Sequence, residues 1–368
     1  MSALENVLGT LNRTGYLFYL KTYSALDRYF QKKSPSIYFF LTDAPLQLFA
    51  SLFDEISYFK TAETDVLLQV ESQLFFFQCV ENLAAITQHP FTVLNLYYDF
   101  TSDYFLDPFS VYPTLRQQFL KLPLNGLQSF QELADLALLI SQYQYTLTEE
   151  VSLGDLLRPL SLTEQRLFLM MLLSSEHPAK GLALLKQTGF IDHYWPELSP
   201  MSLIKQTKDH HPEGDVWLHV LEALKYRKKN DLLLSFAILL HDLGKTVVAG
   251  PKDKPYADHA HQGALLAERF LRRLEFPPAF IQDVSFLVRY HMMPEALPKM
   301  PLYRIEKLLR HELFPTLLEL YRADLMATFQ GPKKYYTACN LYRSFLKTNS
   351  NPFRILKPHQ RLDEANRA

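Results

Sequence analysis

The chain has 368 residues, of which 48% are hydrophobic, and this is enough to bury more than one sizeable core. Its only cysteines, Cys79 and Cys339, lie far apart without a partner motif, which argues against a disulfide framework or a cysteine zinc site. No stretch reaches the roughly 20 apolar residues of a membrane helix, and residues 1–15 lack a basic start followed by an apolar core. We therefore expect a cytoplasmic protein with no membrane partner.

The formal net charge of −1 is unevenly divided along the chain. Residues 1–199 hold 12 Lys and Arg against 21 Asp and Glu, whereas residues 200–368 hold 26 against 18. A basic C-terminal half suits an anionic substrate, while an acidic N-terminal half would repel a phosphate backbone. Ordinary solvated surface charge explains the same asymmetry equally well.

Residues 1–125 mix helical stretches with β-rich runs and predict an α+β domain. The β-rich runs are 36–41, 65–70 and 73–80. The last two are separated by only two residues, which predicts a hairpin. No glycine occurs between Gly15 and Gly126, although loops that bring backbone amides up to nucleotide phosphates usually need glycine.

The rest of the chain follows helical patterns. Residues 126–200 predict a helical neck, with Gly181 and Gly189 as helix boundaries. The helix-period apolar positions there include Leu167, Met170, Met171 and Ser174. Residues 201–345 predict a further helical domain, and 346–368 predict a loosely held tail. The expected fold class is therefore mainly α with an α+β N-terminal domain.

The strongest chemical signal follows a run that is apolar nearly all round. Residues 232–240 predict a buried helix, which ends at His241 and Asp242. Burying an imidazole beside a carboxylate is costly unless something compensates both, and a divalent cation would do so. Adjacent side chains can share one cation only where the helix loosens, and we expect Gly244 to supply a left-handed turn there.

Three further polar residues occupy the apolar faces of predicted helices. His219, His291 and Asp324 each stand three or four residues from buried-type neighbours. The three patterns are Val216, His219, Val220 and Ala223; Val284, Leu287, Val288 and His291; and Leu317, Leu320, Tyr321 and Asp324. One such histidine is usually a hydrogen-bonded core residue. Three polar residues of this kind beside a His-Asp pair predict a metal centre.

We assign His219, His241, Asp242 and Asp324 as the core metal ligands. Mixed imidazole and carboxylate ligands suit Mn, Ni, Co, Fe, Zn or Mg, and the sequence does not choose among them. Such a cation acidifies water and neutralises phosphate oxygens, which predicts hydrolysis of a phosphate ester.

Three more residues extend the predicted centre. His259 opens another helical pattern, and together with His291 it offers either ligands for a second metal or contacts to substrate phosphate. Lys245 is a candidate phosphate contact, so Asp242, His241 and Lys245 are the catalytic candidates. A solvated lysine at a helix end is the simpler alternative for Lys245.

The pattern of histidines and aspartates resembles the HD superfamily of metal-dependent phosphohydrolases. Residues 210–219 (HHPEGDVWLH) and 240–245 (LHDLGK) are similar to the HD domain of bacterial tRNA nucleotidyltransferases, the CCA-adding and poly(A) polymerase family. Residues 189–191 and 196–198 resemble that family's neck-to-body junction. Fainter upstream landmarks are 42–44, 91–96, 98–99 and 106–109. The resemblance implies a nucleotidyltransferase-like head, a helical neck and an all-helical HD body.

The head departs from the family pattern wherever chemistry would occur. The family's Gly-Gly-x-x-Arg loop corresponds to residues 19–27, where both glycines and the arginine are replaced. Its Asp-x-Asp pair would fall at 36–38, and a third acidic residue near Phe76, yet no carboxylate stands at these positions. Two-metal nucleotidyl transfer needs carboxylates to hold the cations, so the head is predicted to be inactive.

Two classes of function follow. In the first, the protein is a metal-dependent phosphohydrolase, and the resemblance implies a nucleotide, a 2′,3′-cyclic phosphate or an RNA-end phosphate as its substrate. In the second, an inactive head and neck form a platform that binds RNA or protein, and the metal is structural. The acidic N-terminal half argues against RNA there. We predict no DNA partner, and residual tRNA nucleotidyltransferase activity is the least favoured alternative.

Overall fold

The computed structural model describes residues 3–32, 37–58, 64–71, 73–83, 88–117, 119–123, 126–147, 149, 151, 160–205, 214–248, 258–328 and 331–348. The chain forms two compact units. The first, the N-terminal unit, comprises Met1–Leu127 and Tyr145–Val151, and the second, the helical unit, comprises Gln128–Gln144 and Ser152–Ala368. The division into head, neck, body and tail at residues 125, 200 and 345 stays a prediction.

Some residues used in the sequence argument lie outside the described ranges. They are Ser36, Ser72, 206–213 and 349–368, which include the first part of the HHPEGDVWLH run and most of the predicted tail.

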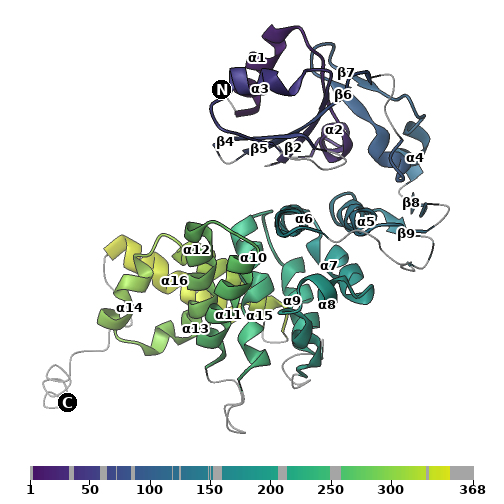
Figure 1. The fold of residues 1–368 in the computed structure, drawn as a ribbon. Helices are drawn as coiled ribbons and strands as arrows, with labels where there is room; N and C mark the ends of the chain where they lie inside the picture. Colours follow the sequence, from purple (N-terminus) through teal and green to yellow (C-terminus); the bar gives the residue numbers. More distant parts are fainter. Residues whose placement is uncertain are drawn as a thin grey trace, which may run out of the picture. The chain divides into compact units, whose positions relative to one another are not determined.

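The N-terminal unit contains a mixed sheet, which in the described residues has the strand order β3-β4-β5-β2-β1-β6-β7 (Figure 1). Its strands are β1 (Phe18–Leu20), β2 (Ile37–Thr42), β3 (Ile56–Tyr58), β4 (Val66–Val70), β5 (Gln73–Cys79), β6 (Tyr97–Asp99) and β7 (Tyr104–Leu106). The other elements are α1 (Ala3–Leu11), η1 (Asn12–Thr14), α2 (Thr22–Tyr29), α3 (Leu46–Leu52), η3 (Thr92–Asn95), α4 (Tyr112–Gln117) and the short pair β8 (Phe119–Leu120) and β9 (Thr146–Leu147). The predicted α+β architecture is confirmed.

The centre of this sheet is built from aromatic residues. Strands β4 and β5 pair antiparallel as the predicted hairpin, and β5 also pairs in parallel with β2. The β2–β5 register stacks three ring pairs with centroids 5.1 to 5.2 Å apart, namely Tyr38 with Phe75, Phe39 with Phe76, and Phe40 with Phe77. Phe40, Phe75 and Phe77 are fully buried, so these rings form the core of the sheet.

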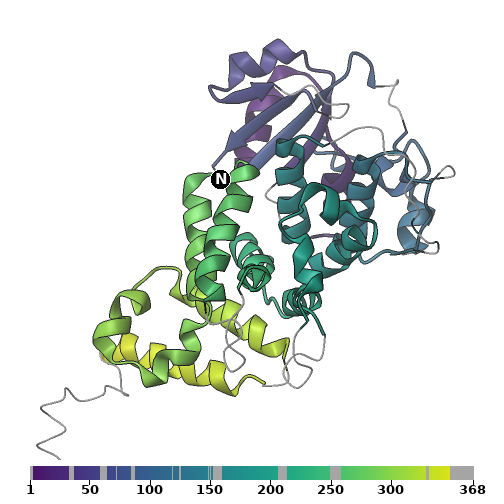
Figure 2. The same ribbon diagram turned by 60° about the horizontal axis from the view of Figure 1, so that its bottom comes forward.

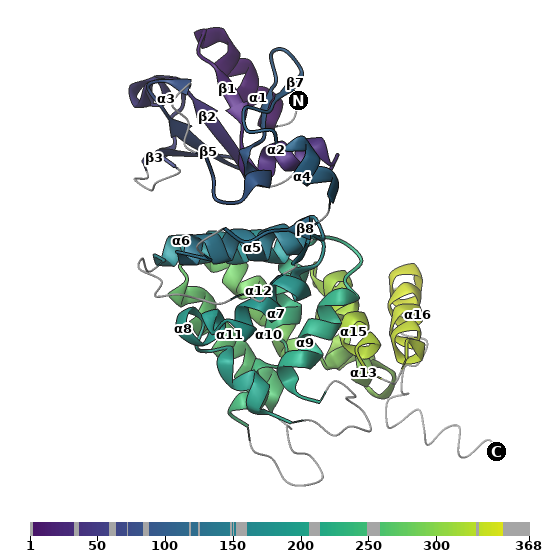
Figure 3. The same ribbon diagram turned by 90° about the vertical axis from the view of Figure 1, so that its right-hand side faces the viewer.

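The helical unit is assembled from helices throughout its described residues, apart from one isolated β-bridge (Figures 1 and 3). Its first helices are α5 (Phe130–Gln142), α6 (Leu162–Ser174), α7 (Pro178–Gln187), α8 (Phe190–Tyr194) and η4 (Ser199–Leu203). The next are α9 (Val216–Lys225), α10 (Leu232–Leu240), η5 (Leu243–Thr246), α11 (His259–Arg273) and α12 (Pro278–Tyr290). The last are α13 (Met293–Ala296), η6 (Leu297–Lys299), α14 (Leu302–Leu309), α15 (Phe314–Met326) and α16 (Lys333–Thr348).

The helical unit has a core around α10, which packs against α9, α12 and α15. Helices α11 and α12 lie side by side and are the two light-green helices of Figure 2. Every residue of α10 from Leu234 to Leu240 is buried, as its apolar sequence predicts. In the described part of the chain, no helix is long and apolar enough to cross a membrane.

One detail of the predicted neck is wrong. Helix α6 buries Gln165, Phe168, Leu169, Leu172 and Leu173. The helix-period positions Leu167, Met170, Met171 and Ser174 lie in this helix and are partly covered. Gly181 lies inside α7, where a Cβ atom would come 2.6 Å from Leu172 Cδ1. Gly189 does mark a helix boundary, with φ +75° before α8.

Arg227, in the segment before α10, forms hydrogen bonds with residues at the end of α6. The guanidinium of Arg227 donates to the backbone oxygens of Leu173 and Ser175 and to Ser235 Oγ. Burial lowers the pKa of Arg227 to about 10, and Asp231 opposes this shift. The carbonyl oxygens at the end of α6 thus take their hydrogen bonds from one largely buried cation.

Replacing Arg227 by methionine should lower the free energy of unfolding by about 2–4 kcal/mol. Buried carbonyls that lose a charged donor cost roughly 1–3 kcal/mol each, and the two losses are not additive. Chemical denaturation measures the change. Arg227→Lys should lose less, and Lys229→Met at an exposed position serves as the control. Surface substitutions usually change the free energy of unfolding by no more than about 0.5 kcal/mol. A change for Arg227→Met within this range would contradict the role of Arg227.

Candidate metal centre

Three helices bring one half of the predicted ligand set together. Helix α9 places His219 in the core, α10 ends at His241, and α15 contributes Asp324. Asp324 Oδ1 lies 3.0 Å from His219 Nε2 and 3.8 Å from His241 Nε2. His219 and His241 are 0% and 1% exposed, so the apolar helical faces that carry these polar residues do point inward as predicted.

Asp242 lies between this group and a second one. Its Oδ2 is 3.4 Å from His241 Nε2 and 3.8 Å from His219 Nε2. Its Oδ1 faces the other way, 3.5 Å from His259 Nε2 and 4.0 Å from His291 Nε2. Two compatible ligand triads share this one carboxylate, namely His219, His241 and Asp242, and Asp242, His259 and His291.

Local backbone geometry explains how neighbouring residues reach the same centre. His241 still has right-handed helical angles, whereas Asp242 has φ −101° and ψ 6°, outside the helical region. The helix therefore loosens between the two residues, as predicted. The Asp242 side chain consequently turns back beside the His241 ring.

Gly244 acts differently from the prediction. It does not adopt a left-handed conformation. It lies in η5, which begins directly after Asp242. A Cβ atom here would overlap the backbone oxygen of His259 and lie 2.5 Å from Gly263 N. The glycine is needed because η5 and the start of α11 approach each other closely, and this approach brings His259 to Asp242.

His241 and His291 are oriented by the same local device. Each directly follows a helix, α10 or α12, and its Nδ1 lies 2.8 or 2.7 Å from the backbone oxygen three residues earlier, that of Ile238 or Val288. A carbonyl can only accept, so Nδ1 carries a hydrogen, and in the neutral ring Nε2 keeps its lone pair. Metal-ligating histidines are commonly held in this way.

The imidazole Nε2 atoms allow a chemical test of the site. His241 Nε2 is fully buried and has no hydrogen-bond partner in the described residues. His259 Nε2 and His291 Nε2 lie 3.0 Å apart, close to the roughly 3 Å expected for two nitrogens at right angles around a cation with bonds of about 2.1 Å. The donor set therefore fits a divalent metal.

The charges of the centre are strongly coupled. Burial would raise the pKa of Asp242, but Lys245, His241, His219 and His259 together lower it well below its usual range. Burial would also raise the pKa of Asp324, but the hydrogen bond from His219 and the charge of His241 together lower it below its usual range. Burial, followed by repulsion from His241 and His259, lowers the pKa of His291 to about 3. At neutral pH the carboxylates are charged and His291 is neutral, the forms that bind metals.

Lys245 lies beside the cluster. Its Nζ is 2.7 Å from Asp242 Oδ2, and its side chain is 10% exposed. It therefore forms a largely buried ion pair, so the alternative of a freely solvated lysine is wrong. Its predicted phosphate contact stays a prediction.

The N-terminal unit shows what occupies the positions expected for a nucleotidyltransferase site. Tyr38 lies on β2 and Phe76 on β5, and both belong to the stacked aromatic core. Thr22, within the segment that corresponds to the glycine loop, has φ +50°, which is unusual for a β-branched residue. Aromatic residues of the sheet core therefore occupy the two positions on β2 and β5.

Known proteins are similar to this chain both in sequence and in fold. The HD domain family model matches residues 176–324. The A-adding tRNA nucleotidyltransferase of Deinococcus radiodurans is 36% identical over 173 residues, which cover 44% of this chain and 38% of that protein. The multifunctional CCA protein of Xylella fastidiosa is 27% identical over 241 residues, 61% of this chain and 58% of that protein. The matched segments thus span less than two thirds of these relatives.

The fold comparison reaches further along the chain. The CCA-adding enzyme of Bacillus stearothermophilus, solved in complex with CTP, aligns with a TM-score of 0.51 and 15% identity over 94% of this chain and 83% of that one. The chain therefore has CCA-adding tRNA nucleotidyltransferases as homologues and as fold neighbours, and it carries an HD domain in its C-terminal part.

Proposed function

We propose that the helical unit is a metal-dependent phosphohydrolase that acts on a nucleotide, a 2′,3′-cyclic phosphate or an RNA-end phosphate. The observation that carries the proposal is the position of Asp242, whose two oxygens face two groups of buried imidazole nitrogens. The match to the HD domain and the kinship with enzymes that process tRNA support it.

We further propose that the site binds two divalent cations. His219, His241 and Asp324 would hold one, His259 and His291 the other, and Asp242 both. Bound divalent cations acidify water and neutralise phosphate oxygens. The alternative, in which His259 and His291 contact substrate phosphate, fits less well because a neutral, deeply buried imidazole such as His291 is a better metal ligand than phosphate contact.

The protein side chains have distinct roles in this proposal. The carbonyls of Ile238 and Val288 orient the His241 and His291 rings, so these rings need no rearrangement to bind. Lys245 balances the charge of Asp242 and stands where it could donate to a phosphate oxygen. The buried α10 beneath the cluster excludes water from one side.

The first test is metal analysis combined with a substrate screen. Protein purified without chelators should contain between one and two equivalents of a divalent metal from the group Mn, Ni, Co, Fe, Zn and Mg. It should hydrolyse 2′,3′-cyclic nucleotides, nucleoside monophosphates or a phosphodiester reporter, and chelation followed by dialysis should remove this turnover reversibly. Bound metal without turnover would favour a structural metal in a binding platform. No metal, even with added cations, would contradict the proposed site.

We also propose that the N-terminal unit does not transfer nucleotides. Two of the positions expected to hold cations, Tyr38 and Phe76, are part of an aromatic core and are 4% and 5% exposed. Carboxylates would have to replace both of these rings. Labelled CTP or ATP should therefore not be incorporated into tRNA that lacks its 3′ end, and incorporation above that of a heat-inactivated sample would contradict this prediction.

A further inference from the structure

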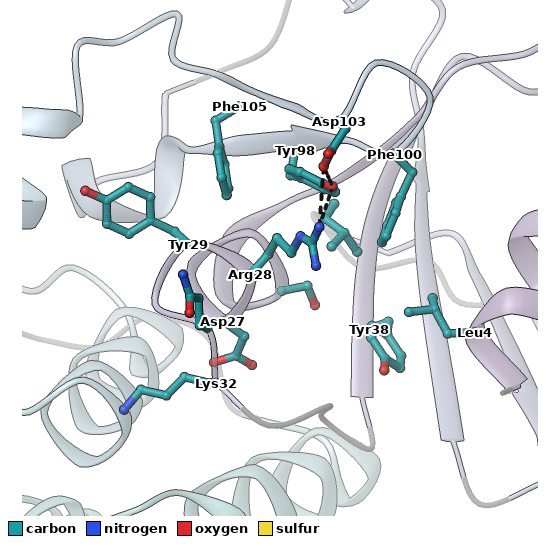
Figure 4. A pocket seen from close by; sticks show the side chains of 13 residues that line it. Leu4, Asp27, Arg28, Tyr29, Lys32, Tyr38, Tyr98, Phe100, Asp103 and Phe105 are labelled. Carbon is teal, nitrogen blue, oxygen red and sulfur yellow. Dashed lines mark hydrogen bonds and ion pairs between the residues drawn. The ribbon is translucent and has the colours of Figure 1, made fainter.

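The N-terminal unit contains a cleft of about 610 Å³, a volume typical of small-molecule sites. It is lined by parts of α1, β1, α2, β2 and the β6–β7 hairpin, and five of its 13 lining residues are aromatic (Figure 4). The rings are those of Tyr29, Tyr38, Tyr98, Phe100 and Phe105. The phosphohydrolase proposal uses none of these residues.

Arg28 projects its guanidinium into this cleft (Figure 4). Its Nη2 donates to Tyr98 Oη at 2.9 Å and to Asp103 Oδ1 at 3.4 Å, and its guanidinium carbon lies 4.8 Å from the Tyr98 ring centroid. The Tyr98 hydroxyl in turn donates to Asp103. The guanidinium is thus held in place on one side.

Two nitrogens of the guanidinium are available to a ligand. Within the described residues, no acceptor is bonded to the Nε and Nη1 hydrogens of Arg28, and the side chain is 52% exposed. These two groups point to different sides of the guanidinium, and each can donate a charge-assisted hydrogen bond to one oxygen of a carboxylate or phosphate. Other charged residues on the cleft wall are Asp27, Lys32 and Asp103, so the anion has to compete with Asp103 for the arginine.

The aromatic rings of the cleft indicate the chemistry of the rest of the ligand. Tyr29 and Phe105 meet edge to face at 5.7 Å on one side, and Tyr98 and Phe100 do so at 5.0 Å on another. Such walls favour a flat ring that stacks on the partly exposed rings of Tyr29, Phe100 and Phe105. We propose that the N-terminal unit binds a small aromatic anion, with a carboxylate or phosphate on Arg28, and that it does so without a metal. This goes beyond the proposed function, because it concerns other residues and another unit.

Calorimetry on the full-length protein in EDTA tests the proposal with three probes, namely AMP, indole-3-carboxylate and inorganic phosphate. At least one aromatic probe should bind at least about tenfold more tightly than inorganic phosphate, since one stacked ring contributes roughly 1–3 kcal/mol. Preference for AMP would identify a phosphate ester as the anion, and preference for the indole acid a carboxylate. No binding of either aromatic probe at millimolar concentration would overturn the proposal.

Two substitutions with opposite expected effects locate the site. Arg28→Met should weaken binding of the aromatic probe by at least about tenfold, because the charge-assisted pair is lost. Asp103→Asn removes the competing carboxylate and should strengthen binding, by at most about fivefold because Asp103 is exposed. Arg13→Met, at an exposed position of η1, should leave the affinity unchanged. Wild-type affinity in Arg28→Met, or weaker binding in Asp103→Asn, would place the ligand elsewhere.

Discussion

Replacing Asp242 by asparagine is expected to reduce turnover by at least about a thousandfold and to remove most of the bound metal. The carboxylate is 2% exposed and lies within 4.0 Å of four imidazole nitrogens. An amide of the same size keeps the packing but offers no negative charge to a cation. A thousandfold loss corresponds to about 4 kcal/mol of transition-state stabilisation, which is in the range that metals supply.

Separate measurements distinguish a chemical loss from an unfolded protein. Circular dichroism should show that Asp242→Asn is folded, and added metal should raise the melting temperature of the wild type while leaving that of the variant unchanged. Asp283→Asn, a partly exposed residue of α12, is the matched control and should keep metal and turnover. Full metal content and activity in Asp242→Asn would mean that the centre does not depend on this shared carboxylate.

Replacing Gly244 by alanine is expected to destabilise the helical unit by about 3 kcal/mol or more. The added methyl group would overlap the backbone oxygen of His259 and lie 2.8 Å from the carbonyl carbon of that residue. Backbone atoms cannot move aside as a flexible side chain can, so η5 and α11 must separate. Since this contact also positions His259 beside Asp242, the metal affinity should fall together with the stability.

Gly9→Ala is the appropriate control for this substitution. Gly9 lies in α1, and a Cβ atom there would meet nothing within 4 Å. Alanine is favoured over glycine in helices by up to about 1 kcal/mol, so this variant should be as stable as the wild type or slightly more stable. Denaturant unfolding and metal titration measure both effects. A free energy of unfolding for Gly244→Ala within about 1 kcal/mol of wild type would show that the contact is not tight.

The sequence predicted the metal centre for a clear physical reason. Polar residues such as His219 and His291 on otherwise apolar helical faces must be buried when the helices pack, and burial requires compensation. The same argument applied to His241 and Asp242 at the end of an apolar helix. The structure brings His219, His241, Asp242, Asp324, His259 and His291 together, although whether they hold metal stays a prediction.

The sequence did not predict which distant segments of the chain approach each other. The division of the Asp242 oxygens between two groups depends on how α11 and α12 are placed against α10, and no spacing along the chain encodes that. The role assigned to Gly244 was wrong because a glycine required by a neighbouring helix resembles, in sequence, a glycine required by its own turn.

The sequence by itself determined the element types and the set of buried polar residues, because periodicity and the cost of burial are local properties. The tertiary structure alone decided which of these residues share a centre, since that depends on contacts between segments up to 105 residues apart, as between His219 and Asp324. It also placed the Arg28 cleft, whose walls come from segments that carry no common motif.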